Sequence, residues 1–112
     1  MGLRAFARVV YSPAGTPSAT VRKGFSAPAD TATGRTTFTL TRGIDRTEGC
    51  VLASFLASTT TQPQATIDAD IATGDTTVEV RVRGSTGVLA DPLAGSGFHV
   101  AVLDDVTNNT IG

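Results

Sequence analysis

The strongest constraint on the fold is a two-residue alternation of apolar and polar side chains. Across residues 76–83, Val78, Val80 and Val82 alternate with charged neighbours. This period is typical of a strand with one buried and one solvated face. No window of a dozen residues keeps the three- and four-residue apolar spacing of an amphipathic helix. The sequence therefore predicts an all-β domain.

A short repeat supports the same fold class. The motif Ala-Thr-Gly-x-Thr-Thr occupies residues 32–37 and returns at residues 72–77, and each copy leads into an alternating run. Glycine reaches positive φ without a Cβ penalty, and paired threonines suit a pleated strand. Each copy is therefore interpreted as a hairpin turn that feeds a strand. Duplication of a half-domain and convergent turn chemistry both explain the repeat.

Seven runs are predicted to be strands: 3–11, 18–26, 35–41, 51–57, 65–71, 76–83 and 98–103. Residues 27–33 and 84–97 are predicted to be loops, and residues 104–112 a polar tail. Short strands with a turn between each pair indicate a small antiparallel β-sandwich or barrel of about seven strands. A chain of 112 residues is expected to form one domain, 1–112, with a two-layer core.

The apolar run 50–57 contains the predicted strand 51–57, which is apolar on both faces, so we expect it to form a central strand. Val51 and Phe55 should then lie in the interior, and Cys50 should be a buried, inert thiol. Because Cys50 is the only cysteine, the chain has no internal disulfide and no cysteine-based zinc site.

The sequence holds no catalytic constellation, so we predict a protein that is not an enzyme and has no catalytic residues, cofactor or bound metal. His99 is the only histidine, and no nucleophile or carboxylate partner is evident for it. The carboxylates of Asp68, Asp70 and Asp75 approach the spacing of a calcium loop, but the further acidic ligand is missing. Asp68 and Asp70 also fall on the exposed face of a predicted strand, where solvated carboxylates are ordinary, so no metal site is predicted there.

Charge and composition bear on the partner. A net charge of −1 gives no basic footprint for nucleic acid and no polybasic patch for membranes. No secretory signal is evident, so the chain is expected to be made in a cytoplasm. Only 17% of the residues are charged, and Lys23 is the single lysine, which suits a surface that lies against neighbours. A GC-rich genome would produce the same bias.

The first strand offers one candidate partner interface, made of Arg4, Phe6 and Arg8. Strict alternation would place the three side chains on one face. Guanidinium groups pair with carboxylates and stack on aromatic rings, so this face suits a protein interface. A solvated edge strand that uses arginine against edge-to-edge pairing is the other interpretation. The 84–97 loop and the polar tail are expected to be flexible, and to add further contacts.

Residues 24–57 resemble a module of tailed-bacteriophage virion proteins. In that module a Gly-Phe strand leads through a Thr-Gly turn to an aromatic-Thr strand, and a small-apolar strand follows. The matching segments here are Gly24-Phe25, Asp30, Thr33-Gly34, Phe38-Thr39-Leu40-Thr41 and Val51-Leu52-Ala53-Ser54. The module is similar to β-sandwich domains of phage tail-fibre tips and of capsid decoration proteins.

The resemblance implies a structural virion protein rather than an enzyme. A freestanding sandwich without a trimerising shaft is most similar to a capsid decoration, or cement, protein. Such proteins bind the outer surface of the major capsid protein, commonly as homotrimers, and lie on the virion surface after synthesis in the host cytoplasm. The alternative is a receptor- or glycan-binding module of a tail fibre or head fibre. The small number of aromatic residues counts against that alternative.

Overall fold

The computed structural model describes residues 2–42, 49–56, 66–71, 76–84 and 86–104. The described residues form eight strands: β1 (Gly2–Tyr11), β2 (Pro17–Lys23), β3 (Ala29–Ala32), β4 (Arg35–Thr39), β5 (Gly49–Leu56), β6 (Thr66–Ile71), β7 (Thr77–Arg83) and β8 (Gly97–Asp104). None of the described segments is helical, and so none forms a helix that could cross a membrane. The prediction of an all-β fold is confirmed.

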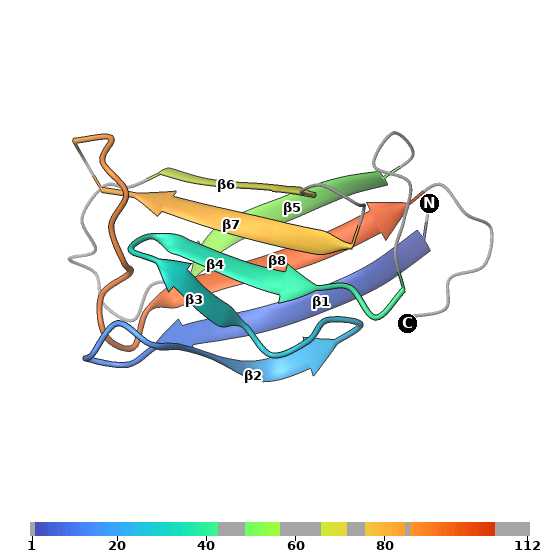
Figure 1. The fold of residues 1–112 in the computed structure, drawn as a ribbon, viewed down its shortest axis with the longest axis horizontal. Coiled ribbons are helices and arrows are strands. Elements are labelled where there is room, and N and C mark those ends of the chain that lie inside the picture. Colours follow the sequence, from blue (N-terminus) through green and yellow to red (C-terminus); the bar gives the residue numbers. More distant parts are fainter. Residues whose placement is uncertain (1, 43–48, 57–65, 72–75, 85, 105–112) are drawn as a thin grey trace.

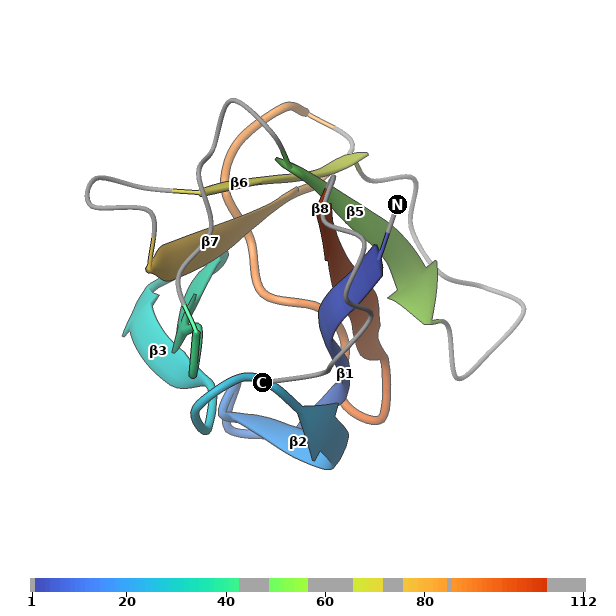
Figure 2. The ribbon, with the colours of Figure 1, turned by 90° about the vertical axis from the view of Figure 1, so that its right-hand side faces the viewer.

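The strands form two four-stranded antiparallel sheets (Figure 1). The first sheet has the order β2-β1-β8-β5, and the second sheet has the order β3-β4-β7-β6. Figure 2 shows the two sheets as separate layers that face each other across the core. At one edge, β5 of the first sheet lies beside β6 of the second. The fold is therefore a sandwich and not a closed barrel, which decides between the two predicted architectures.

The core is built by the inward faces of the alternating strands. Val78, Val80 and Val82 of β7 are buried, as the alternation predicts. Phe38 of β4 lies at the centre, with its ring centroid 4.9 Å from that of Phe25 and 6.3 Å from that of Phe98. The Phe38 and Phe98 rings meet edge to face at 85°, a favourable arrangement for the ring quadrupoles.

One buried polar pair joins the two sheets. The hydroxyl groups of Tyr11, on β1, and Thr36, on β4, form a hydrogen bond with each other. Both side chains are buried, with 2% and 0% of their surface exposed. Burial raises the pKa of Tyr11 to about 12, because the phenolate would lose its hydration in this environment. The pair satisfies two hydroxyl groups that would otherwise be unpaired inside the core.

Strand β3 corrects the prediction of a loop at residues 27–33. Its residues pair with β4 at the edge of the second sheet, and all four are exposed. Without a buried face they show no apolar alternation, so no sequence pattern indicated a strand here. Gly34 makes the β3–β4 turn with a φ of 72°, as the first copy of the repeat predicts. The turn of the second copy, at residues 72–75, lies outside the described residues.

Strand β5 corrects the prediction of a central strand at 51–57. It pairs with β8 at the edge of the first sheet. Val51 and Phe55 do pack against the core, but they are only partly buried. The outward side chains include Leu52, which is 58% exposed, and Cys50, which is exposed rather than buried as predicted. The apolar character of both faces therefore does not reflect two buried faces.

The long connection between β7 and β8 is attached to the sandwich along its described part. The Asp91 carboxylate accepts a 2.8 Å hydrogen bond from the Gly34 amide, which fixes the β3–β4 turn. The amide of Gly95 donates to the Tyr11 carbonyl over 2.8 Å. Strand β8 then begins at Gly97, where a Cβ atom would lie 1.8 Å from the Val9 carbonyl oxygen. The described part of this loop is therefore joined to the sandwich by several hydrogen bonds. Its flexibility stays a prediction, and the tail at 105–112 lies outside the described part of the chain.

Candidate protein-binding face

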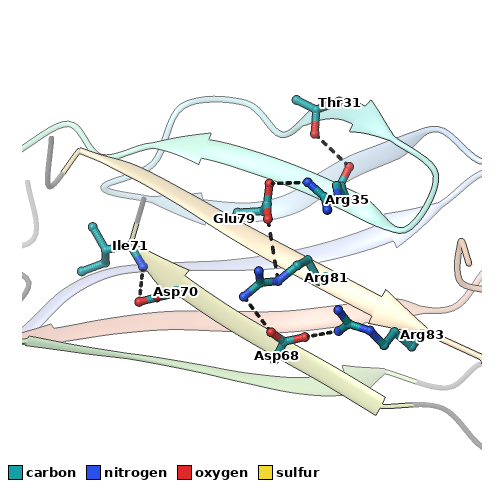
Figure 3. Close-up of polar contacts among 8 residues, drawn as sticks. All are labelled: Thr31, Arg35, Asp68, Asp70, Ile71, Glu79, Arg81 and Arg83. Atoms are coloured by element: carbon teal, nitrogen blue, oxygen red, sulfur yellow. Dashed lines mark hydrogen bonds and ion pairs between the residues drawn. The ribbon is translucent and has the colours of Figure 1, made fainter. Parts of the chain in front are cut away.

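The outer face of the second sheet is covered by ion pairs between its own side chains (Figure 3). The Asp68 carboxylate lies 2.8 Å from the Arg81 guanidinium through one oxygen and 2.8 Å from the Arg83 guanidinium through the other. Glu79 lies 3.7 Å from Arg81 and 3.9 Å from Arg35. The charges on this face therefore neutralise one another.

The same contacts bear on the possible calcium ligands. Both oxygens of Asp68 are engaged by arginines, and one oxygen of Asp70 accepts a hydrogen bond from the Ile71 amide. Within the described segments, no group of three potential metal ligands comes together. Asp75 lies outside those segments. The interpretation of Asp68 as a solvated surface carboxylate is the one that its ion pairs support.

The outer face of the first sheet has a different chemistry. Directly paired residues of antiparallel strands lie on the same face, so the strand register assembles rows of side chains across the sheet. The Phe6 row consists of Lys23, Phe6, Ala101 and Leu52 on successive strands. The Arg8 row consists of Val21, Arg8, His99 and Ser54. Beyond the Phe6 row, Leu3, Leu103 and Cys50 continue the surface. Most of these side chains are apolar.

These rows surround a groove of about 400 Å³ in the middle of the face. Its lining includes Phe6, Val21 and Leu52 as the large apolar side chains, with Ala101 between Phe6 and Leu52 in the register. Leu52 is 58% exposed and Val21 is 47% exposed. Large apolar side chains that gather around one groove mark an interaction surface more often than isolated ones do.

Apart from the Cys50 thiol, the ionisable side chains on the described part of this face are all basic. They are Arg8, Lys23 and His99, none of which has an ion pair among the described residues. Arg8 donates a 3.0 Å hydrogen bond from Nη1 to the Thr20 hydroxyl, which uses one of its five N–H groups. The groove is thus apolar with a positively charged side.

The structure places two of the three predicted interface residues in this groove. Phe6 and Arg8 line it, from neighbouring outward positions of β1. Arg4 does not, because a bulge between Leu3 and Ala5 interrupts the alternation, and Arg4 is only 8% exposed. The sequence argument counted pleats through this bulge and so placed Arg4 on the wrong surface. The role of the three residues in an interface stays a prediction.

Most of the groove was missed by the sequence reasoning, although one signal was present. The two-sided apolar run at 50–57 supplies Leu52, and its neighbour Ser54 lies directly opposite His99. No hydrogen bond between the side chains of Ser54 and His99 is present, and the described part of the face carries no carboxylate that could orient the imidazole. As arranged, the groove offers apolar contact and positive charge rather than an activated nucleophile.

Comparisons with known proteins gave no match: no family model, no curated protein and no solved structure is similar to this chain at a significant level. The resemblance to phage virion modules therefore stays an expectation from the quoted motifs.

Proposed function

We propose that this protein is a structural virion protein that decorates and stabilises a phage capsid by binding the outer surface of the major capsid protein. The observation that carries the proposal is the difference between the two outer faces. One face neutralises its charges internally, whereas the other presents an apolar groove with exposed Leu52 and Val21. We assign attachment to the outer face of the first sheet.

The free energy that one contact through this face can contribute is modest, which suits attachment at many equivalent positions on a shell. Completing the burial of one large aliphatic side chain contributes up to roughly 1.5–3 kcal/mol, and Leu52 and Val21 have about half of their surface still to bury. One such contact gives modest affinity. Many copies that hold neighbouring capsomers, or a homotrimer that binds through three equivalent faces, would act multivalently and hold the shell strongly.

The second candidate is a receptor- or glycan-binding module of a tail fibre or head fibre. Carbohydrate sites usually stack a sugar on an exposed aromatic ring, and the groove offers Phe6 for this purpose. Phe25, Phe38 and Phe98 are buried in the core, and Phe55 packs against it. One partly buried ring is a poor stacking platform, so the groove favours a protein partner.

The first experiment locates the protein in purified virions by gold-labelled antibody and cryo-electron microscopy. Copies spread over the capsid are expected. A few copies at the tail tip or at one vertex would instead favour the adhesion module. Particles that lack the protein should also lose heat resistance, and equal resistance with and without it would exclude a cementing role.

The second experiment tests the face. Leu52→Glu places a charge at the groove on the edge strand β5, and Thr66→Glu places the same charge on the other sheet's edge strand β6, where Thr66 is exposed. Occupancy of the capsid should fall at least tenfold for Leu52→Glu and stay unchanged for Thr66→Glu, with similar thermal midpoints for the two isolated proteins. Equal occupancy of both variants would remove this face from the interface.

A further inference from the structure

We infer that the groove binds an extended protein segment that carries an apolar side chain and, two positions away, a carboxylate. This inference rests on the proposed function, because it names the chemistry of the partner at the same face. It follows from the two rows of side chains across the first sheet, and from the distance between them.

The Phe6 row provides the seat for the apolar side chain. Ala101 lies between Phe6 and Leu52 in the strand register, so a small residue is flanked by two large ones. All three line the groove. The depression over Ala101, between the side chains of Phe6 and Leu52, accepts a branched or aromatic side chain. These three residues offer no side-chain hydrogen bond to a polar ligand group.

The Arg8 row provides the seat for the carboxylate. Arg8 and His99 are direct partners across β1 and β8, and Thr20 occupies only one Arg8 donor. The remaining guanidinium N–H groups form a planar fork that matches a carboxylate. No acidic side chain on the described part of the face competes for them. A partner of negative charge is therefore complementary to this row.

The spacing of the two seats favours an extended partner. Phe6 and Arg8 are two residues apart on β1, as are Ala101 and His99 on β8. Two residues of a strand span about 6.6 Å, which is also the distance between same-face side chains i and i+2 of an extended ligand. An extended segment that lies along β8 would thus place its apolar residue against Ala101 and its Asp or Glu beside Arg8.

A second copy of this chain fits the groove less well. On the described part of this face, a second copy would present the basic side chains Arg8, Lys23 and His99 and no carboxylate to pair with Arg8. Like charges in a desolvated contact oppose association. The complementary occupant is therefore an acidic and apolar segment of another protein.

The test is a selection of random displayed peptides on the folded full-length protein. Wild type should enrich peptides with an apolar residue and an Asp or Glu two positions apart. Leu52→Glu should abolish the enrichment, and Arg8→Glu should exchange the acidic preference for Lys or Arg at that position. Arg35→Glu, an equal charge reversal on the other sheet, is the matched control and should select the same peptides as wild type.

Synthetic peptides then provide the quantitative comparison. A selected peptide with Glu should bind wild type at least tenfold more tightly than its Gln counterpart, and also than a version with the Glu shifted by one position. Titrations followed by amide chemical shifts measure these affinities and show whether the groove residues respond. Circular dichroism confirms that each variant is folded.

The outcomes separate this inference from the proposed function. Enrichment of apolar residues without an acidic preference would overturn the inference and leave docking through this face intact. A preferred spacing of three or four residues would replace the extended segment with a helix and overturn it as well. Failure to enrich any sequence over Leu52→Glu would also overturn it, while the location of the protein in purified virions tests the proposed function independently. Concentration-dependent dimers that Leu52→Glu abolishes would identify a second copy as the occupant.

Discussion

Removing both hydroxyl groups of the pair between the sheets should cost less than the two single removals added together. Tyr11→Phe leaves the Thr36 hydroxyl, which is 0% exposed, without its partner, and Thr36→Val does the same to the Tyr11 hydroxyl. A buried hydroxyl without a hydrogen bond costs about 1–3 kcal/mol, and we expect each single variant to lose about that much unfolding free energy. The double variant leaves no unpaired hydroxyl, so its loss should be smaller than the sum of the two single losses by about 1–2 kcal/mol.

Urea unfolding followed by far-ultraviolet circular dichroism measures this cycle. Tyrosine fluorescence does not serve, because Tyr11 is the only tyrosine and the chain has no tryptophan. Thr36→Ser is the conservative control, since it keeps a hydroxyl at the same position and should restore most of the stability lost in Thr36→Val. Losses that add within about 0.5 kcal/mol would refute the reasoning, because independent sites behave in that way.

Three further outcomes follow from the packing. Since burial raises the pKa of Tyr11 to about 12 from 10.0, its contribution to stability should be present below pH 10 and fall by about 2 kcal/mol as the pH rises to 12. This loss should be absent in Tyr11→Phe, and phenolate absorbance against pH measures the titration. Phe38→Ala should lower the free energy of unfolding by about 3–5 kcal/mol and Phe55→Ala by about half as much. The reason is that Phe38 is 1% exposed, whereas Phe55 is only partly buried on an edge strand. Equal losses of the two variants in urea unfolding would contradict that placement. Cys50 should react with a maleimide in the native protein nearly as fast as in urea, and strong native protection would contradict its exposure.

The alternation predicted the strands that have one buried face. In β7, a slip of one residue would move Val78, Val80 and Val82 from the core to solvent, so only one register is compatible with the sequence. In the predicted strand 35–41, alternation likewise puts Phe38 and Leu40 on one face, and both are buried, Phe38 in β4 and Leu40 just after its end. The burial of these residues could be predicted because the alternation of a strand with one buried face depends on that single property.

Two features could not be predicted, because no local pattern of buried side chains marks them. Strand β3 has no buried side chain, so its place at the sheet edge depends on backbone hydrogen bonds to β4 that any sequence can make. The bulge at Arg4 also depends on the register between β1 and β8, which no local pattern encodes. Without that register, the pleat count from Arg8 back to Arg4 ends on the extra residue of the bulge, which is Arg4 itself, and assigns the wrong surface.

The run 50–57 shows where sequence reasoning about burial stops. Apolar residues on both faces of a strand indicate that both faces avoid water, and a central strand is the simplest way to do so within one chain. In the structure only the inner face, with Val51 and Phe55, packs against this chain's own core. The outer face leaves Leu52 58% exposed beside the groove. The pattern is therefore equally compatible with a central strand and with an edge strand whose second apolar face is covered by another protein. The sequence cannot distinguish a covering layer made by its own chain from one made by a partner, because the transfer of apolar surface from water is favourable in both cases.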